Sequence, residues 1–93
     1  MKMKIQVSQN DIFLGRPGSE SECPIALAIK RVRPDAHVGV TGDKIEFDYI
    51  SYFTCDEIMH FVNDYDVHIP VEPFEFEMDE DELVCNPLTK TNP

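Results

Sequence analysis

Prolines limit where helices can form in this chain. Pro24 and Pro34 bound the segment CPIALAIKRVRP, and proline is tolerated in the first turn of a helix but cannot continue one. The apolar residues between them recur with helical spacing: Ile25, Ala28, Ile29 and Val32. Pro70 and Pro73 exclude helix from the segment HIPVEP. The pattern predicts one amphipathic helix over residues 24–33 and an extended segment near residue 70.

A second helix is predicted over residues 55–65. Thr54 and Glu57 have the spacing of a capping box, in which each side chain accepts a hydrogen bond from the other residue's backbone N–H. The apolar stripe behind it comprises Cys55, Ile58, Val62 and Tyr65. Ser8 and Asp11 have the same spacing, which predicts a short helical turn that closes at Gly15.

Alternating apolar and polar residues predict strands in the rest of the chain. Residues 3–7 alternate in this way, as do residues 74–78 with Phe74, Phe76 and Met78 on one face. Residues 38–40 and 45–49 flank the turn sequence Thr41–Lys44 and predict a hairpin.

The predicted order is β-α-β-β-α-β, which favours an α+β fold. We expect a four-stranded antiparallel sheet with both helices on one face, in the ferredoxin-like strand order 4-1-3-2. Lys2 and Lys4 would then lie on the uncovered face between two acidic strands. A chain of 93 residues is expected to form one core, here residues 1–80, followed by a mobile acidic tail over residues 81–93.

Charge is distributed unevenly along the chain, whose net charge is −10. Residues 1–45 carry seven Lys and Arg against five Asp and Glu, a net charge of +2. Residues 46–93 carry thirteen acids and only Lys90 as a base, a net charge of −12. Such a field repels free nucleic acid and anionic lipid and attracts basic surfaces. The alternative is that the acids only keep the protein in solution.

These acids predict a binding surface for a basic partner. The candidates lie on the predicted sheet face and on a rim after the second helix: Glu46, Asp48, Asp64, Asp66, Glu72, Glu75 and Glu77. Lys30, Arg31 and Arg33 could contact a nucleic-acid backbone only inside a complex that already holds it, because three cations cannot offset this net charge.

Catalytic and metal-binding patterns are missing from the sequence. Cys23 precedes a helix start, where a thiol can become nucleophilic, but Glu20 and Glu22 beside it oppose the thiolate. The three cysteines and three histidines lack the paired spacing of a zinc site, and the run DEDE lacks the glycine of a calcium loop. We therefore expect no enzyme activity, no metal and no cofactor.

Cysteine usage and hydropathy bear on location. The three cysteines are odd in number and widely spaced, which is typical of reduced thiols in a cytoplasm. No apolar run approaches the roughly 20 residues that span a bilayer. We expect a cytoplasmic protein without membrane contact, and the high net charge favours a monomer.

Three motifs resemble those of a family of small bacteriophage and prophage proteins. They are D-I-x-x-G at Asp11, Ile12 and Gly15, C-P-I-A-x-A from Cys23 to Ala28, and P-V-E-P-F-x-F from Pro70 to Phe76. The resemblance covers about four fifths of the chain by eye, and its motifs are structural rather than catalytic.

Size, acidity and the phage-like motifs are similar to those of anti-CRISPR proteins. The resemblance implies a stoichiometric inhibitor of a type I-F crRNA-guided surveillance complex in the cytoplasm of an infected bacterium. Its acidic side chains would compete with DNA for a basic surface of that complex. The alternative is a small phage structural or regulatory protein whose acidity confers only solubility.

Overall fold

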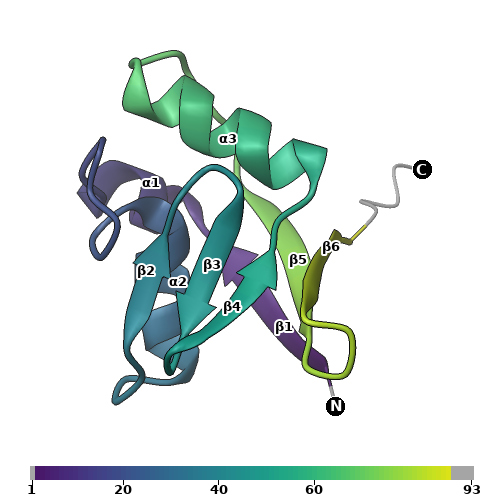
Figure 1. The fold of residues 1–93 in the computed structure, drawn as a ribbon. Helices are drawn as coiled ribbons and strands as arrows, with labels where there is room; N and C mark the ends of the chain where they lie inside the picture. The colour runs from purple at the N-terminus through teal and green to yellow at the C-terminus, as the bar shows by residue number, and fades with distance from the viewer. Residues whose placement is uncertain (1, 89–93) are drawn as a thin grey trace.

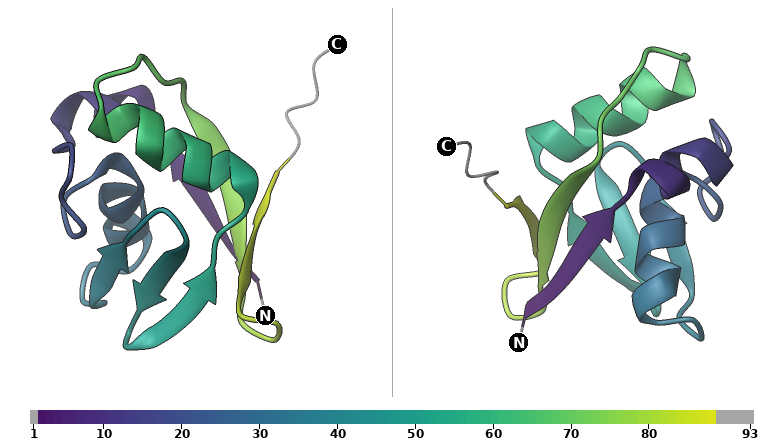
Figure 2. Two further views of the ribbon diagram at one scale, coloured as in Figure 1. Left: turned by 45° about the horizontal axis from the view of Figure 1, so that its top comes forward. Right: turned by 180° about the vertical axis from the view of Figure 1, so that it is seen from behind.

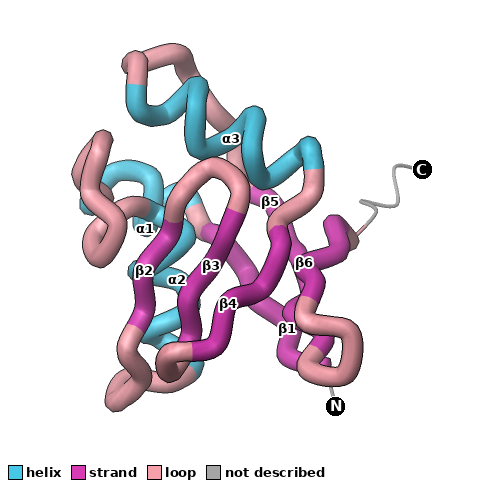
Figure 3. Tube along the Cα trace, in the orientation of Figure 1, coloured by secondary structure: helices cyan, strands magenta, loops and turns pink. Residues whose placement is uncertain are grey.

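The computed structural model describes residues 2–88, which form three helices and six strands (Figures 1 and 3). In chain order the elements are β1 (Lys2–Val7), α1 (Gln9–Leu14), α2 (Pro24–Val32), β2 (Val38–Val40), β3 (Lys44–Phe47), β4 (Ile50–Phe53), α3 (Asp56–Asp66), β5 (Phe74–Asp79) and β6 (Val84–Pro87). The predicted α+β class is correct. Each strand and helix that the sequence predicts has a counterpart among these elements.

The predicted four-stranded ferredoxin-like sheet is wrong. The strands form one six-stranded mixed sheet in the order β1-β5-β6-β4-β3-β2, and β4 pairs with β6 in parallel while the other neighbours are antiparallel. Strands β5, β6 and β4 therefore separate β1 from β3. The lysines of β1 lie at one edge of the sheet rather than between two acidic strands.

The first additional strand, β4, results from a tight turn after Phe47. Asp48 and Tyr49 have φ angles of 51° and 68°, and Phe47 pairs directly with Ile50 across them. Positive φ at both central residues is the geometry that joins antiparallel strands in a two-residue hairpin. The chain therefore reverses at Asp48, so that the strand predicted over residues 45–49 ends at Phe47 and a further strand begins at Ile50.

The second additional strand, β6, lies within the segment predicted as a mobile tail. Asp79 Oδ1 accepts hydrogen bonds from the backbone N–H groups of Asp81 at 2.9 Å and Glu82 at 3.3 Å. This turn directs Val84–Pro87 back into the sheet between β5 and β4. The acidic run is thus a turn, and residues 89–93 of the predicted tail lie outside the described residues.

The sheet curls around α2. Seen from behind, α2 lies beside β1, and it also packs against β2 at the opposite edge of the sheet (Figure 2). Its predicted apolar stripe is largely confirmed, because Ile25, Ala28 and Ile29 are fully buried, although Val32 is 46% exposed. Burial of apolar surface stabilises a fold by roughly 25 cal/mol per Å². Because α2 is enclosed by the sheet, its buried side chains form the centre of the core.

Helices α1 and α3 lie toward the same end of the fold (Figures 1 and 2). The predicted helix start at Ser8 is confirmed, since Ser8 and Asp11 form a capping box. A Cβ atom at Gly15 would lie 2.7 Å from Cδ of Pro24, so glycine permits the close approach of α1 to α2. Helix α3 runs across one end of the curled sheet (Figure 1) and buries Ile58 and Phe61.

Candidate functional site

The predicted partner-binding acids do not form one continuous surface. Four of the seven have partners within the fold: Glu46 with His37 at 3.0 Å, Asp48 with Arg33 at 3.7 Å, Glu75 with Lys4 at 3.0 Å, and Asp66 with the backbone N–H of Gly18 at 2.8 Å. Glu77 lies in β5, in register with Lys4 of β1 and Asn86 of β6. Only Asp64 and Glu72 come together, at a groove beside α3.

The three predicted nucleic-acid contacts are also engaged. Lys30 Nζ donates a hydrogen bond to the carbonyl of Ser21 at 2.6 Å, and Arg31 forms an ion pair with Asp11 at 2.6 Å. Arg33 forms an ion pair with Asp48, and its guanidinium lies 5.5 Å from the ring centroid of Phe47. Arg31 also donates to the carbonyl of Gln6 at 2.8 Å. These three cations, two in α2 and one directly after it, therefore support the fold, and the candidate site lies elsewhere.

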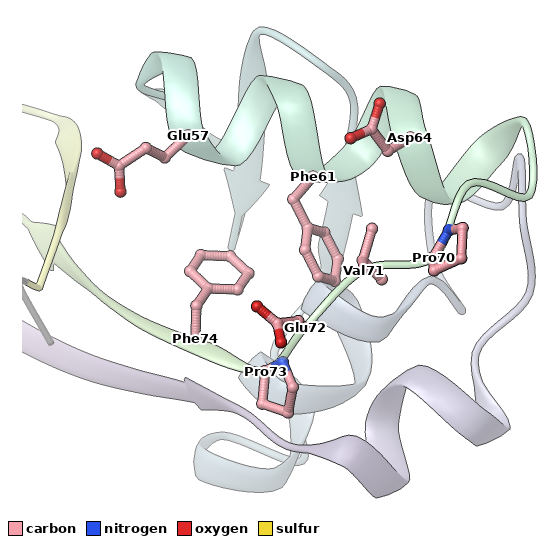
Figure 4. Close-up of a pocket in the computed structure, with 8 residues that line it drawn as sticks. All are labelled: Glu57, Phe61, Asp64, Pro70, Val71, Glu72, Pro73 and Phe74. Atoms are coloured by element: carbon pink, nitrogen blue, oxygen red, sulfur yellow. The ribbon is translucent and has the colours of Figure 1, made fainter. Parts of the chain in front are cut away.

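The candidate site is a groove between α3 and the segment that leads into β5 (Figure 4). Helix α3 contributes Glu57, Phe61 and Asp64, and residues Pro70–Phe74 form the other side. The groove has a volume of about 360 Å³, at the small end of the roughly 300–1,000 Å³ range of ligand pockets. We call it the acidic groove.

Helical spacing brings the α3 residues onto one face. Glu57, Phe61 and Asp64 follow the i, i+4, i+7 pattern, which aligns side chains along a helix. The capping box predicted for Thr54 and Glu57 is wrong, because Cys55 is the N-cap residue and makes no side-chain cap. Thr54 Oγ1 instead donates to the carbonyl of Gly42 at 2.8 Å. Glu57 is consequently available to line the groove.

The opposite wall is extended because of its prolines. Helix α3 ends at Asp66, and the N–H of Ile69 then donates to the carbonyl of Asp64 at 2.8 Å as the chain turns back. Pro70 and Pro73 prevent helix in the next residues, as the sequence predicts. This segment places Glu72 opposite α3 and delivers Phe74 to the start of β5.

The floor of the groove is aromatic. The ring centroids of Phe61 and Phe74 lie 4.8 Å apart with the rings tilted by 46°, and Phe74 also stacks on Phe76 at 5.7 Å. The Glu72 carboxylate lies next to the two rings, and Glu57 and Asp64 project from α3 two turns apart, with Phe61 between them (Figure 4). Cations are attracted both to carboxylates and to the faces of aromatic rings.

The carboxylates of the acidic groove lack intramolecular partners. Within residues 2–88, the side chains of Glu57, Asp64 and Glu72 make no ion pair and no hydrogen bond. Their charges are therefore not compensated locally, in contrast to those of Glu46 and Glu75. A positively charged group of a ligand would find unpaired carboxylates along an apolar floor.

Cysteine chemistry does not explain this site. Burial raises the pKa of the Cys23 thiol, and it raises the pKa of Cys85 to about 12, so both thiols are protonated at neutral pH.

Across the described part of the chain, no group of three or more His, Cys, Asp or Glu side chains could hold a metal ion. No helix in that part combines the length and apolar character needed to cross a membrane.

Comparisons with known proteins return no relative. No family model, no curated protein and no solved structure matches the chain. The resemblance to small phage proteins consequently stays a prediction from the three sequence motifs.

Proposed function

We propose that this protein acts by binding, and that it holds a basic segment of a partner protein in the acidic groove. The observation that carries the proposal is the set of three unpaired carboxylates, Glu57, Asp64 and Glu72, around the rings of Phe61 and Phe74. A lysine or arginine of the partner would gain both charge attraction and contact with an aromatic ring.

Long-range charge supports this mode of binding. A net charge of −12 over residues 46–93 attracts a basic surface before contact and accelerates association. A stable interface needs about 800 Å² per partner. This is a modest share of the accessible surface of 5820 Å², so a molecule of this size can supply it.

In its finer form, the proposal is that the partner is a nucleic-acid-handling complex of an infected bacterium. The protein would then be a stoichiometric inhibitor in the host cytoplasm, and a type I-F crRNA-guided surveillance complex is the first candidate. Surfaces that hold DNA phosphates are rich in Lys and Arg. The groove offers such residues carboxylates in place of phosphates.

Competition with DNA tests the proposal directly. A purified type I-F surveillance complex is mixed with the protein, and its binding to target DNA is measured by gel shift. Co-elution of the protein with the complex on a sizing column measures their association. The variant Glu57→Gln/Glu72→Gln should lose inhibition, whereas Glu80→Gln/Glu82→Gln changes the net charge equally but lies outside the groove. Equal loss in both variants would contradict a role for the groove, and unimpaired DNA binding without co-elution would remove the anti-CRISPR form.

One observation favours the alternative of a structural or regulatory protein whose acidity confers only solubility. Four of the seven predicted binding acids have partners within the fold, as Glu46 and Glu75 illustrate. Under this alternative, the groove variant and its charge-matched control should behave identically in every binding assay and differ from the parent only in solubility.

A further inference from the structure

A second hollow adjoins the acidic groove and differs from it in chemistry. It is lined by Ile12, Pro17, Tyr65, His68 and Ile69, and it shares Pro70 and Val71 with the acidic groove. Its volume is about 230 Å³. We call it the apolar hollow. The two depressions follow one another along the extended segment between α3 and β5.

The walls of the apolar hollow are held in place by a long-range hydrogen bond. The hydroxyl of Tyr65, near the end of α3, donates to the carbonyl of Ile12 in α1 at 2.9 Å. This contact joins residues 53 positions apart in the chain. The hollow is therefore part of the folded core structure rather than a gap between independent loops.

Large apolar side chains are exposed where these two helices end. Ile69 is 50% exposed and Val67 is 64% exposed after α3, and Phe13 and Leu14 in the last turn of α1 are 81% and 60% exposed. Of these four side chains, Ile69 lines the apolar hollow, so the hollow has an accessible apolar wall that another molecule could cover. The neighbouring acidic groove then supplies charge specificity for that molecule.

Building on the proposed function, we infer that the groove and the hollow together bind an extended segment in which arginine and a large apolar residue stand two positions apart. The arginine lies in the acidic groove, and the apolar residue fills the apolar hollow. Side chains at positions i and i+2 of an extended chain point the same way and are separated by roughly 7 Å, which suits two adjoining depressions.

Arginine fits the acidic groove better than lysine does. Its planar guanidinium can stack on the partly exposed ring of Phe74, and its N–H donors can bond the Glu72 carboxylate that lies beside that ring (Figure 4). Lysine offers a compact charge without a planar face. Glu57 and Asp64 lie two turns apart on α3 and contribute negative charge at either side of this position.

Blocked synthetic peptides with the core Arg-Ala-Leu or Leu-Ala-Arg test this inference by fluorescence anisotropy at low salt. Matched peptides replace arginine with lysine or with neutral citrulline, and leucine with alanine. Citrulline should weaken binding roughly threefold to fivefold in the parent protein and have a clearly smaller effect in Glu72→Gln. Alanine should weaken binding roughly threefold in the parent and have a clearly smaller effect in Ile69→Ala.

Control variants keep the result specific. Glu80→Gln removes an exposed acid outside the groove, and Phe53→Ala removes an exposed apolar side chain from β4, so both should retain the full citrulline and alanine effects. Circular dichroism confirms that each variant is folded. Ile69 and Glu72 are partly exposed, so their substitution leaves the core intact.

The possible failures are distinguishable. If replacing leucine with alanine in the peptide weakens binding to Ile69→Ala as much as it weakens binding to the parent, the apolar hollow has no role. This inference is then overturned, while the proposed function survives through Glu72. Equal affinity for lysine and arginine peptides overturns the assignment of arginine. Binding that is indifferent to citrulline, or no binding by any peptide, overturns both the inference and the proposed role of the acidic groove.

Discussion

Among single residues, Asp11 shows how a charge can serve the fold alone. Its side chain is 5% exposed, and its two oxygens accept hydrogen bonds from Arg31 at 2.6 and 2.8 Å. Burial by itself raises the pKa of this carboxyl, but the bonds from Arg31 and Ser8 outweigh burial and hold the pKa below its ordinary value of 3.8. Its position in the D-I-x-x-G motif therefore has a structural explanation.

Substitution of Arg31 tests this ion pair. Arg31→Ala should lower the free energy of unfolding at pH 7 by about 2 kcal/mol, because it leaves a buried carboxylate unpaired. The pKa of Asp11 is lowered in the folded protein, so its contribution is complete above pH 3.8 and is lost as the pH falls through the folded value. Urea unfolding of parent and variant should thus show a difference that shrinks in acid.

The exposed pair between Arg16 and Glu22 provides the control for this measurement. Its atoms are 3.6 Å apart and both side chains are more than half exposed, so Arg16→Ala should cost less than about 0.5 kcal/mol. If the two substitutions have equal effects at neutral pH, the pair of Arg31 and Asp11 does not have the stabilising role assigned to it.

At the candidate site, the sequence predicts some residues and misses others. Asp64 and Glu72 are predicted as part of an acidic rim, and both line the groove. Glu57 is missed because its spacing from Thr54 indicates a capping box, and Phe61 is missed because it lies outside the predicted apolar stripe. The i, i+4, i+7 spacing of Glu57, Phe61 and Asp64 is the sequence signal that could have grouped them.

At the level of elements, α3 begins with an unusual cap. Cys55 has the extended backbone of an N-cap residue but makes no side-chain hydrogen bond to the first turn. Cys55→Ser places a hydroxyl where it can accept from a free N–H, and it should raise the free energy of unfolding by about 1 kcal/mol. Chemical denaturation measures the change, and a less stable variant would show that packing of the sulfur outweighs the missing cap.

The elements that the sequence predicts are those with strong local patterns. The stripe of α2, the alternation in β1 and β5, and the turn between β2 and β3 all depend on nearby residues. The strands β4 and β6 are missed for two different reasons. Asp48-Tyr49 is not among the glycine-containing pairs that mark a two-residue hairpin, and β6 is a short strand that forms through pairing with β5.

These two strands change the arrangement of charge over the whole molecule. Because β6 and β4 enter the sheet, the acids of β5 and β3 lie apart, and each set has a cation or histidine beside it. The predicted acidic sheet face is thereby dispersed. Of the predicted partner-binding acids, Asp64 and Glu72 keep uncompensated charge at a depression, where Glu57 joins them beside α3.

Salt should stabilise the folded protein and weaken its binding to a basic partner. The net charge of −10 is confined to a molecule with a radius of gyration of 12.0 Å, so its acids repel one another across the fold. The Debye length falls from about 10 Å at 0.1 M to about 3 Å at 1 M salt, which screens this repulsion. Sodium chloride should therefore raise the urea midpoint of unfolding while it weakens binding to an arginine peptide. A midpoint that falls with salt would mean that internal ion pairs stabilise the fold by more than the repulsion between acids destabilises it, and binding that does not weaken with salt would contradict the charge attraction proposed for the groove.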